Sequence, residues 1–576
     1  MLFVVYASSD FGRKGNQMAL IEFCDYNFGY PGSSENALSN INLSIEEGEF
    51  VLVCGPSGCG KTTLIKQLLP AVSPYGTVEG GLFISGKRIE EIDDSELVTM
   101  FGYVGQNPIN QMVTDKVWHE LAFGMENLGL SQDVMERRIA EICEFFGMQS
   151  WLDRDVSTLS GGEMQMVHLA SVMVMEPNVL ILDEPTAYLD PLAGRNLLDM
   201  IKRINIELGT TVIIVEHHLE EVYGMSDKVV AMGKAQIHHV GTPRGVAKEL
   251  GFKAGLPSAL LIAKEVDNDS KDLPLTVSEG QRWIAKRFEG VCLDEYNEKM
   301  VSKEFDDSFS SLSNNKELIK LKDISFSYDN TKAVLEDCNL SVHEGEIFAL
   351  LGGNGTGKST LLQIICQTLK QSFGNIWIFG KKVNGNKNVP LGNEAMVFMP
   401  QDAMALFTAI TVEEELMEAL EGTSVDIHKK RELVSDMLLK IDLTGYDKYH
   451  PYDLSSGQQQ MLALGKLLLL NPKIILMDEP TKGLDYNRKI EIGNRIKHLS
   501  EQGITILLVS HDIEFCARFA NRCGLMHNGR IVAIDRTREF FSGNKFFTTA
   551  SNRIARRFIP KAILPEEVIT FCKEEM

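Results

Sequence analysis

The stretch GPSGCGKTT at residues 55–63 returns as GGNGTGKST at residues 352–360, and both copies fit the pattern G-x-x-x-x-G-K-[S/T]. In such a loop, successive backbone N–H groups turn inward to cradle phosphates, and the glycines permit the close approach. An apolar segment precedes each copy and a helical pattern follows it, at residues 50–53 and 63–69, and again at 347–351 and 360–369. The strand, loop and helix that a phosphate-binding loop (P-loop) requires are therefore predicted twice.

Later motifs repeat in the same order, which indicates a duplicated domain. Lys61 and Lys358 lie 297 positions apart, and three later pairs each lie 295 positions apart: Gln106 and Gln401, Ser160 and Ser455, Asp183 and Asp478. A single loop of this kind could arise by chance, but a series in constant register could not. We expect a first domain at residues 1–250 and a second at 316–576. The connector 251–315 is expected to be partly helical and then, in its Ser-rich end, flexible.

The two domains are predicted to belong to the α/β class, as tandem P-loop NTPase domains. The segments 179–182 and 474–477 are continuously apolar, each ends in Asp-Glu-Pro-Thr, and a further apolar segment follows each of them. Such runs between helical segments indicate parallel strands buried on both faces. Alternating segments near the start of each domain add an antiparallel β part, and the charged stretches 115–151 and 412–446 predict an inserted helical subdomain.

The composition narrows the possible partners. The chain has 576 residues, of which 44% are hydrophobic, and its 57 Lys+Arg against 79 Asp+Glu give a net charge of −22. This charge argues against nucleic-acid binding, which needs a basic surface. No apolar run reaches the roughly 18 residues of a spanning helix, and no signal peptide is recognisable. We therefore expect no nucleic-acid partner, no membrane span of its own and a cytoplasmic working site.

The P-loops predict two sites for ATP and Mg²⁺. Lys61 and Lys358 would neutralise the β and γ phosphates, and the hydroxyls of Thr62 and Ser359 would ligate Mg²⁺. The remaining loop positions would contact the nucleotide through their backbone: Gly55, Pro56, Ser57, Gly58, Cys59, Gly60 and Thr63 in the first copy, and Gly352, Gly353, Asn354, Gly355, Thr356, Gly357 and Thr360 in the second.

Each half also supplies residues for hydrolysis. An aspartate ends the apolar strand, where its carboxylate would lie beside Mg²⁺ at the edge of the sheet. The glutamate after it would act as general base for the attacking water, and a histidine after the next strand would reach the γ phosphate. These residues are Asp183, Glu184 and His217 in the first half, and Asp478, Glu479 and His511 in the second.

The segments LSGGE at 159–163 and LSSGQ at 454–458 resemble the signature of ABC ATPases, and the resemblance covers both halves. In that family two nucleotide-binding domains meet head to tail, and each ATP lies between the P-loop of one and the signature of the other. The resemblance implies that site one joins residues 55–63 with Ser455, Ser456, Gly457 and Gln458. Site two would join residues 352–360 with Ser160, Gly161, Gly162 and Glu163.

The same resemblance implies further contacts with the nucleotide. It assigns Tyr30 and Tyr328 to stacking on adenine, although an aromatic residue packed near a strand end remains an alternative for each. It assigns two glutamines to the loops that sense Mg²⁺ and two aspartates to the loops that face the partner site: Gln106, Gln401, Asp190 and Asp485.

The second signature departs from the family at Ser456, which stands where the first signature glycine is expected. Its side chain would lie near the phosphates of site one. The hypothesis is that site one hydrolyses ATP more slowly than site two but remains active.

A narrower resemblance concerns the first half and the connector. The segments 105–124, 215–222 and 274–280 are similar to ATPases of energy-coupling-factor and cobalt-type importers, whereas MPQD at 399–402 in the second half lacks the corresponding motif. The resemblance implies a peripheral protein at the cytoplasmic face that drives a transmembrane coupling subunit and a small substrate-binding membrane subunit, for a vitamin or a metal ion. A fused sugar-importer ATPase and a soluble tandem ABC ATPase acting on ribosomes or DNA remain alternatives.

Overall fold

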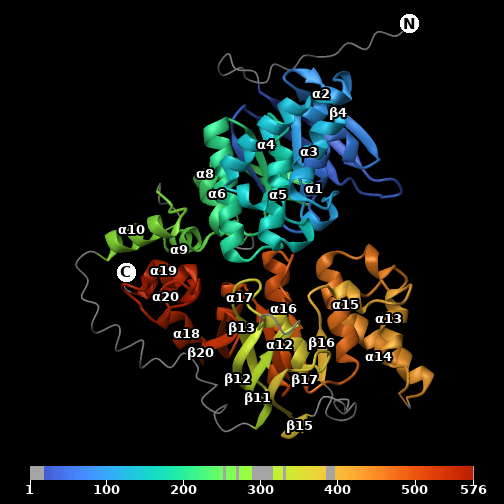
Figure 1. Cartoon of the computed structure of the whole chain (residues 1–576), viewed down its shortest axis with the longest axis vertical. Helices are drawn as coiled ribbons and strands as arrows, with labels where there is room; N and C mark the ends of the chain where they lie inside the picture. Colours follow the sequence, from blue (N-terminus) through green and yellow to red (C-terminus); the bar gives the residue numbers. More distant parts are fainter. Residues whose placement is uncertain are drawn as a thin grey trace.

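The two halves of the chain form two lobes of the same design, one above the other in Figure 1. The computed structural model describes residues 19–250, 255–267, 272–288, 316–328, 333–383, 396–423 and 425–574. In each lobe a six-stranded sheet packs beside a four-stranded antiparallel sheet. The predicted α/β duplication is confirmed.

The central sheets have the same strand order in both lobes. In the first the order is β10 (Gln236–Gly241), β9 (Lys228–Gly233), β3 (Phe50–Cys54), β8 (Thr211–Val215), β7 (Val179–Asp183) and β6 (Phe101–Val104). In the second it is β20 (Arg530–Arg536), β19 (Arg522–His527), β13 (Ile347–Leu351), β18 (Thr505–Ser510), β17 (Ile474–Asp478) and β16 (Met396–Met399). Neighbouring strands are parallel except in the β9–β10 and β19–β20 pairs. Strands β3, β7 and β8 are buried throughout, as continuous apolar segments require.

The antiparallel sheets also correspond. They contain β2 (Leu38–Ile45), β1 (Ile21–Gly29), β4 (Thr77–Ile84) and β5 (Lys87–Arg88) in the first lobe, and β12 (Leu335–His343), β11 (Glu317–Phe326), β14 (Phe373–Ile378) and β15 (Lys381–Val383) in the second. Exposed and buried residues alternate along most of β2, because one face of this sheet covers the core and the other faces solvent.

The helices after the P-loops are shorter than predicted. Helix α1 is Lys61–Lys66 and helix α12 is Lys358–Ile365, whereas the sequence pattern extends to residues 69 and 369. Pro70 disfavours a helical conformation at the residue before it. In the second half Gln367 has φ +65°, a left-handed conformation that ends a helix.

The remaining helices correspond in pairs. The inserted helical part comprises α3 (Val117–Asn127), α4 (Gln132–Phe146) and α5 (Gly161–Met173), matched by α13 (Val412–Glu418), α14 (Ile427–Lys440) and α15 (Ser456–Leu468). Helices α6 (Pro191–Leu208), α7 (Leu219–Val222) and α8 (Pro243–Glu249) match α16 (Tyr486–Glu501), α17 (Ile513–Phe519) and α18 (Thr537–Gly543), and α2 is Asp94–Met100. None of the helices in the described part of the chain is both long and apolar enough to cross a membrane.

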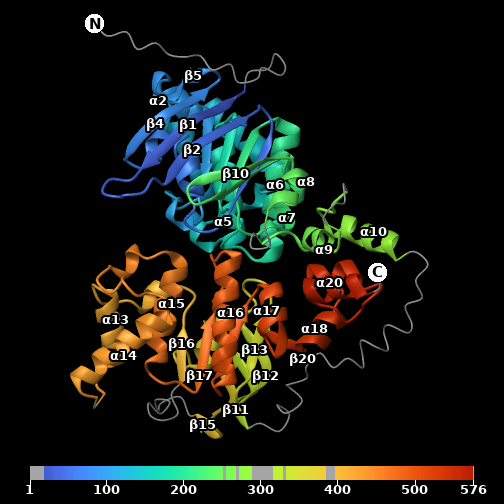
Figure 2. The same cartoon turned by 180° about the vertical axis from the view of Figure 1, so that it is seen from behind.

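The connector and the C-terminal end share one apolar core. Helices α9 (Ser258–Val266) and α10 (Val277–Arg287) lie beside α19 (Ala550–Ala555) and α20 (Pro565–Glu574) in Figures 1 and 2. Ile262 and Ile284 pack there with Ile554 and Phe571. Leu260 of α9 also belongs to the core of the first lobe, so the connector packs on both lobes. The Ser-rich end of the connector, from residue 304 to 315, is predicted to be flexible and lies outside the described residues.

Candidate functional site

Each P-loop joins a buried strand to a helix that starts at its lysine. The glycine before that lysine, Gly60 or Gly357, has φ +101°, and a Cβ on Gly60 would come within 2.5 Å of the carbonyl oxygen of Ala37. Only glycine fits this position. The Nζ of Lys61 donates to the carbonyl oxygens of Gly55 and Pro56 at 2.9 and 3.0 Å, and Lys358 makes the equivalent bonds in the second loop.

Asp183 lies where a magnesium ligand is expected in the first half. It accepts a hydrogen bond from the hydroxyl of Thr62 at 3.1 Å and is 2% exposed. Burial and the negative charge of Glu184 raise the pKa of Asp183 to about 6. A buried carboxylate next to a hydroxyl is a suitable oxygen ligand pair for Mg²⁺.

The second half repeats this arrangement. Burial raises the pKa of Asp478, while a hydrogen bond from Ser359 acts in the opposite direction. The Oδ1 atom of Asp478 is buried and has no hydrogen-bond partner among the described residues, which fits a cation ligand. Gln401 lines the cavity at this loop, whereas no hydrogen bond in the described ranges joins Gln106 to Thr62 or Asp183.

A glutamate and a histidine pair at each site. The Nε2 atom of His217 lies 2.9 Å from Oε1 of Glu184, and the Nδ1 atom of His511 lies 2.9 Å from Oε2 of Glu479. Both glutamates have positive φ, +48° and +51°, which is strained for a residue other than glycine. A buried carboxylate held in this way can accept a proton from a water molecule, and the histidine can bind an adjacent phosphate oxygen.

The two tyrosines assigned to adenine lie beside their P-loops. The hydroxyls of Tyr30 and Thr63 are 3.0 Å apart, and those of Tyr328 and Thr360 are 3.3 Å apart. The tyrosines are 42% and 59% exposed, and each makes an edge-on contact with the phenylalanine two residues before it. A ring fixed at its edge with an exposed face is suited to stacking on a base.

The halves meet head to tail at both P-loops. Oδ2 of Asp485, in the second half, accepts a hydrogen bond from the backbone N–H of Ser57 at 2.9 Å. Oδ2 of Asp190, in the first half, accepts one from the N–H of Asn354 at 3.3 Å. Each aspartate also caps the helix that follows it, α16 or α6. Tyr188 of the first half joins the second P-loop in lining a cavity of about 210 Å³.

The signature segments begin helices. Ser160 caps α5 and Ser455 caps α15, and each bonds reciprocally with the residue three positions later, Glu163 or Gln458. The pattern S-x-x-E/Q in both segments is typical of this capping box. Ser456 is the exposed first residue of α15. In the described residues no hydrogen bond joins a signature segment to the opposite P-loop.

A further buried carboxylate, Glu216, was not among the predicted site residues. It is 1% exposed and accepts hydrogen bonds from the N–H and hydroxyl of Thr186 at 3.1 and 2.7 Å. Burial, together with the charge of Glu184, raises the pKa of Glu216 to about 7. The second half has Ser510 at this position, so comparing VEHH at 215–218 with VSHD at 509–512 could have identified Glu216.

Comparisons with known proteins give one consistent result. The family model described as ABC transporter matches residues 38–187 and 335–482. The chain is 37% identical to an ABC transporter ATP-binding protein of Bacillus cereus, over 97% of this chain and 99% of that protein. It is 32% identical to one of Caldanaerobacter subterraneus, over 93% and 96%. Among solved structures, cbiO1 from Clostridium perfringens, described as part of the ABC transporter complex cbiONQ, is 31% identical, covers 40% of this chain and 91% of its own, and has a TM-score of 0.38.

Proposed function

Because the chain belongs to the ABC transporter family and is a tandem ATP-binding ATPase of it, we propose that it energises an importer of the energy-coupling-factor or cobalt type. ATP bound at each P-loop would be enclosed by the other half. The observation that carries this pairing is the two cross-half contacts of Asp485 with Ser57 and of Asp190 with Asn354. Hydrolysis would remove the γ phosphate and so change how the halves pair.

The residues of each site have distinct roles in the proposed reaction. The loop N–H groups and Lys61 or Lys358 bind the phosphates. Thr62 with Asp183, and Ser359 with Asp478, would hold Mg²⁺, which would supply positive charge near the phosphate oxygens. Glu184 and Glu479 accept the proton of the attacking water, and His217 and His511 orient the γ phosphate. We assign the domains to residues 1–250 and 316–576, with 251–315 as connector.

ABC ATPases of this family usually work with transmembrane components, and we propose that these dock on two segments with exposed apolar residues. Ile109, Val113 and Trp118 follow β6 and are 68%, 64% and 45% exposed. Met404 and Ile410 follow β16 at the equivalent place and are 40% and 72% exposed. Exposed apolar side chains grouped in this way are typical of interaction surfaces.

The nature of the partners is inferred from the sequence. The similarity of segments 105–124, 215–222 and 274–280 to energy-coupling-factor and cobalt-type ATPases supports a transmembrane coupling subunit and a small substrate-binding membrane subunit. The cargo would be a vitamin or a metal ion. The chain would then work at the cytoplasmic face of the membrane, attached through these subunits.

The double variant Ile109→Asp and Val113→Asp is expected to lose about tenfold or more of the membrane subunits that co-purify with the chain, because it places two charges in an apolar contact. Its ATPase rate in isolation should stay near that of the unmodified chain. The measurement is purification from detergent-solubilised membranes. Ile206→Asp is the control, since Ile206 on α6 is 70% exposed and lies outside the docking segments. Recovery of the chain with ribosomes instead of membrane subunits would contradict the importer proposal.

The difference at Ser456 predicts unequal sites. Glu479→Gln leaves only site one active, and Glu184→Gln leaves only site two. The variant in which only site one is active is expected to hydrolyse ATP about 2- to 10-fold more slowly than the variant in which only site two is active. The reason is that the Ser456 side chain displaces backbone from the phosphates in the transition state. Steady-state phosphate release from both variants gives the comparison, and Ser456→Gly should raise the rate of site one. Equal rates, unaffected by Ser456→Gly, would be the contrary result.

A further inference from the structure

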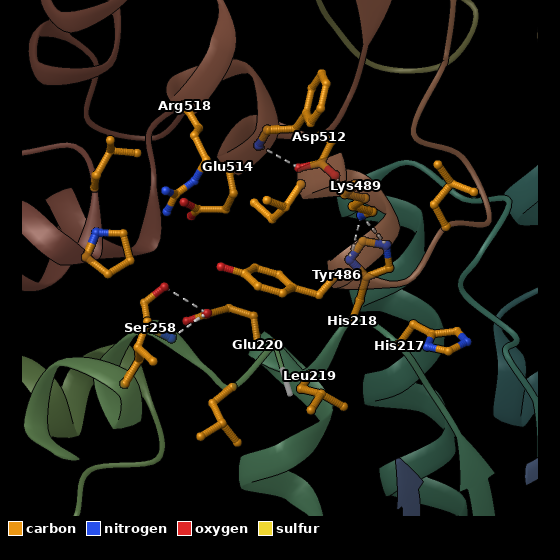
Figure 3. A pocket seen from close by; sticks show the side chains of 18 of the residues that line it. His217, His218, Leu219, Glu220, Ser258, Tyr486, Lys489, Asp512, Glu514 and Arg518 are labelled. Carbon is orange, nitrogen blue, oxygen red and sulfur yellow. Dashed lines mark hydrogen bonds and ion pairs between the residues drawn. The ribbon is translucent and has the colours of Figure 1, made fainter. Parts of the chain in front are cut away.

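A cavity of about 150 Å³ lies between the two halves, outside both P-loops (Figure 3). The first half contributes residues 217–220 to its wall, and the connector contributes residues around Ser258. The second half contributes the beginnings of α16 and α17. Any relative movement of the halves changes this cavity, so charged contacts across it respond to that movement.

Lys489, on α16, makes a charge-assisted hydrogen bond between the halves. Its Nζ donates to Oδ2 of Asp512 in its own half at 2.6 Å and to Nε2 of His218 in the first half at 2.9 Å. Figure 3 shows the lysine placed between these two side chains. The side chains of Lys489 and Asp512 are only 11% and 13% exposed, so solvent screens the pair weakly.

The contact has no symmetric copy. His218 and Asp512 occupy equivalent positions after the catalytic histidines of the two halves, but the residue of α6 equivalent to Lys489 is Gly194. Glycine carries no side chain that could bridge the halves. Lys489 therefore contacts the residues at both equivalent positions, His218 and Asp512.

Each partner of Lys489 directly follows a catalytic histidine: His218 follows His217, and Asp512 follows His511. These histidines each lie 2.9 Å from the proposed general base of their site. Lys489 also lies one helical turn after Asp485, whose carboxylate contacts the first P-loop. The lysine thus contacts the catalytic segments of both sites.

We propose that Lys489 is a positioning residue that couples the two ATP sites, by holding the segment after the histidine of one site against the equivalent segment of the other. This rests on the catalytic roles proposed above for Glu184 and Glu479. Movement of the halves at site one alters the Lys489–His218 contact. Asp512, which shares the same ammonium group, then shifts together with the neighbouring His511.

The charges at this contact support the arrangement. The positive charge of Lys489 lowers the pKa of His218 to about 3, and His511 and His217 act in the same direction. Asp512 acts in the opposite direction. His218 is therefore neutral at physiological pH and accepts the hydrogen bond. His218 itself is exposed, so solvent partly screens its contact with Lys489. Burial opposes the charge of Asp512, but the charge and hydrogen bond of Lys489 hold the pKa of Asp512 below its usual range.

The experiment measures whether the hydrolysis rates of the two sites add. Glu479→Gln isolates site one, Glu184→Gln isolates site two, and the unblocked full-length chain gives the combined rate. Independent sites require the two single-site rates to sum to the combined rate. With Lys489 present, the sum of the two single-site rates is expected to be about fivefold or more below the combined rate. When all three chains also carry Lys489→Met, the sum of the single-site rates is expected to equal the combined rate.

Two further variants separate coupling from a structural role. Lys489→Arg keeps the charge, so the summed single-site rates should still fall below the combined rate. Lys497→Met removes an exposed cation from the same helix and should also leave this shortfall unchanged. Thermal unfolding of each chain identifies any that do not fold, and in that case Asp512→Asn replaces Lys489→Met as the test.

The outcomes distinguish this proposal from the function it rests on. A sum that equals the combined rate with Lys489 present, or a deficit that persists in Lys489→Met, overturns the coupling role. Unchanged hydrolysis in both Glu184→Gln and Glu479→Gln would instead overturn the catalytic assignment.

Discussion

A chain that carries both Glu184→Gln and Glu479→Gln is expected to bind ATP and to hydrolyse it about 10²- to 10⁴-fold more slowly than the unmodified chain. The amide keeps the size of the carboxylate but cannot accept the proton of the attacking water. Each glutamate is paired with its histidine at 2.9 Å, and the lysine and hydroxyl groups that would bind the phosphates and Mg²⁺ are unchanged. Phosphate release measures hydrolysis, and equilibrium binding of a fluorescent ATP analogue measures retention of the nucleotide.

The matched control removes one exposed carboxylate from each half. Glu96→Gln with Glu421→Gln makes the same chemical change away from the sites and should leave the rate unchanged. If the Glu184→Gln, Glu479→Gln chain hydrolysed ATP at a rate comparable with this control, another group would have to be the base.

Lys466→Met is expected to destabilise the second half by about 3–5 kcal/mol, because it leaves a buried carboxylate without its cation. Glu415 is 0% exposed, and the Nζ of Lys466 lies 2.6 Å from its Oε2 and 2.7 Å from Oε2 of Glu418. Glu415 also accepts hydrogen bonds from the backbone N–H groups of Thr408 and Ala409. Urea unfolding, followed by far-UV circular dichroism, gives the change in the free energy of unfolding.

The loss of stability is expected only in the second half, because the equivalent glutamate of the first half has no lysine partner among the described residues. Glu120, equivalent to Glu415, accepts hydrogen bonds from Val113 and from both the N–H and the hydroxyl of Thr114, and Ser171 stands at the position of Lys466. Lys448→Met, at an exposed position, is the control for loss of a cation. A double variant with Glu415→Leu and Lys466→Met should recover much of the stability. A change below about 1 kcal/mol for Lys466→Met would show that Glu415 needs no ion pair.

Much of the fold follows from local rules that the sequence displays. The glycine at residue 60 fits only a loop that passes close to another backbone, and the uninterrupted apolar residues of β3, β7 and β8 fit only strands covered on both faces. These rules act within a few residues of one another, and each appears twice, so the buried parallel strands and the P-loop surroundings could be predicted. The order of the strands in the sheets was not predicted, because it depends on contacts between distant parts of the chain. The ends of α1 and α12 were predicted too late, because the apolar pattern continues past them and the effect of Pro70 on the preceding residue was not considered.

Contacts that depend on how the two halves pack against each other could not be predicted from the sequence. Lys489 is one of several charged residues on α16, and nothing in its neighbours along the chain indicates a partner in the first half. The burial of Glu216 could not be predicted either, because a glutamate after a buried strand can equally lie in an exposed loop. In the structure it is 1% exposed. The differences between the halves at these positions were visible in the sequence, but their partners became apparent only in three dimensions.

The apolar core shared by α9, α10, α19 and α20 has a consequence for how activity depends on concentration. Two separate ATP-binding chains must find each other in solution, so their pairing weakens on dilution. Here both lobes are held to one core through Ile262, Ile284, Ile554 and Phe571. Each P-loop therefore meets its partner half at a fixed effective concentration. The ATPase rate per molecule should accordingly stay constant as the protein is diluted.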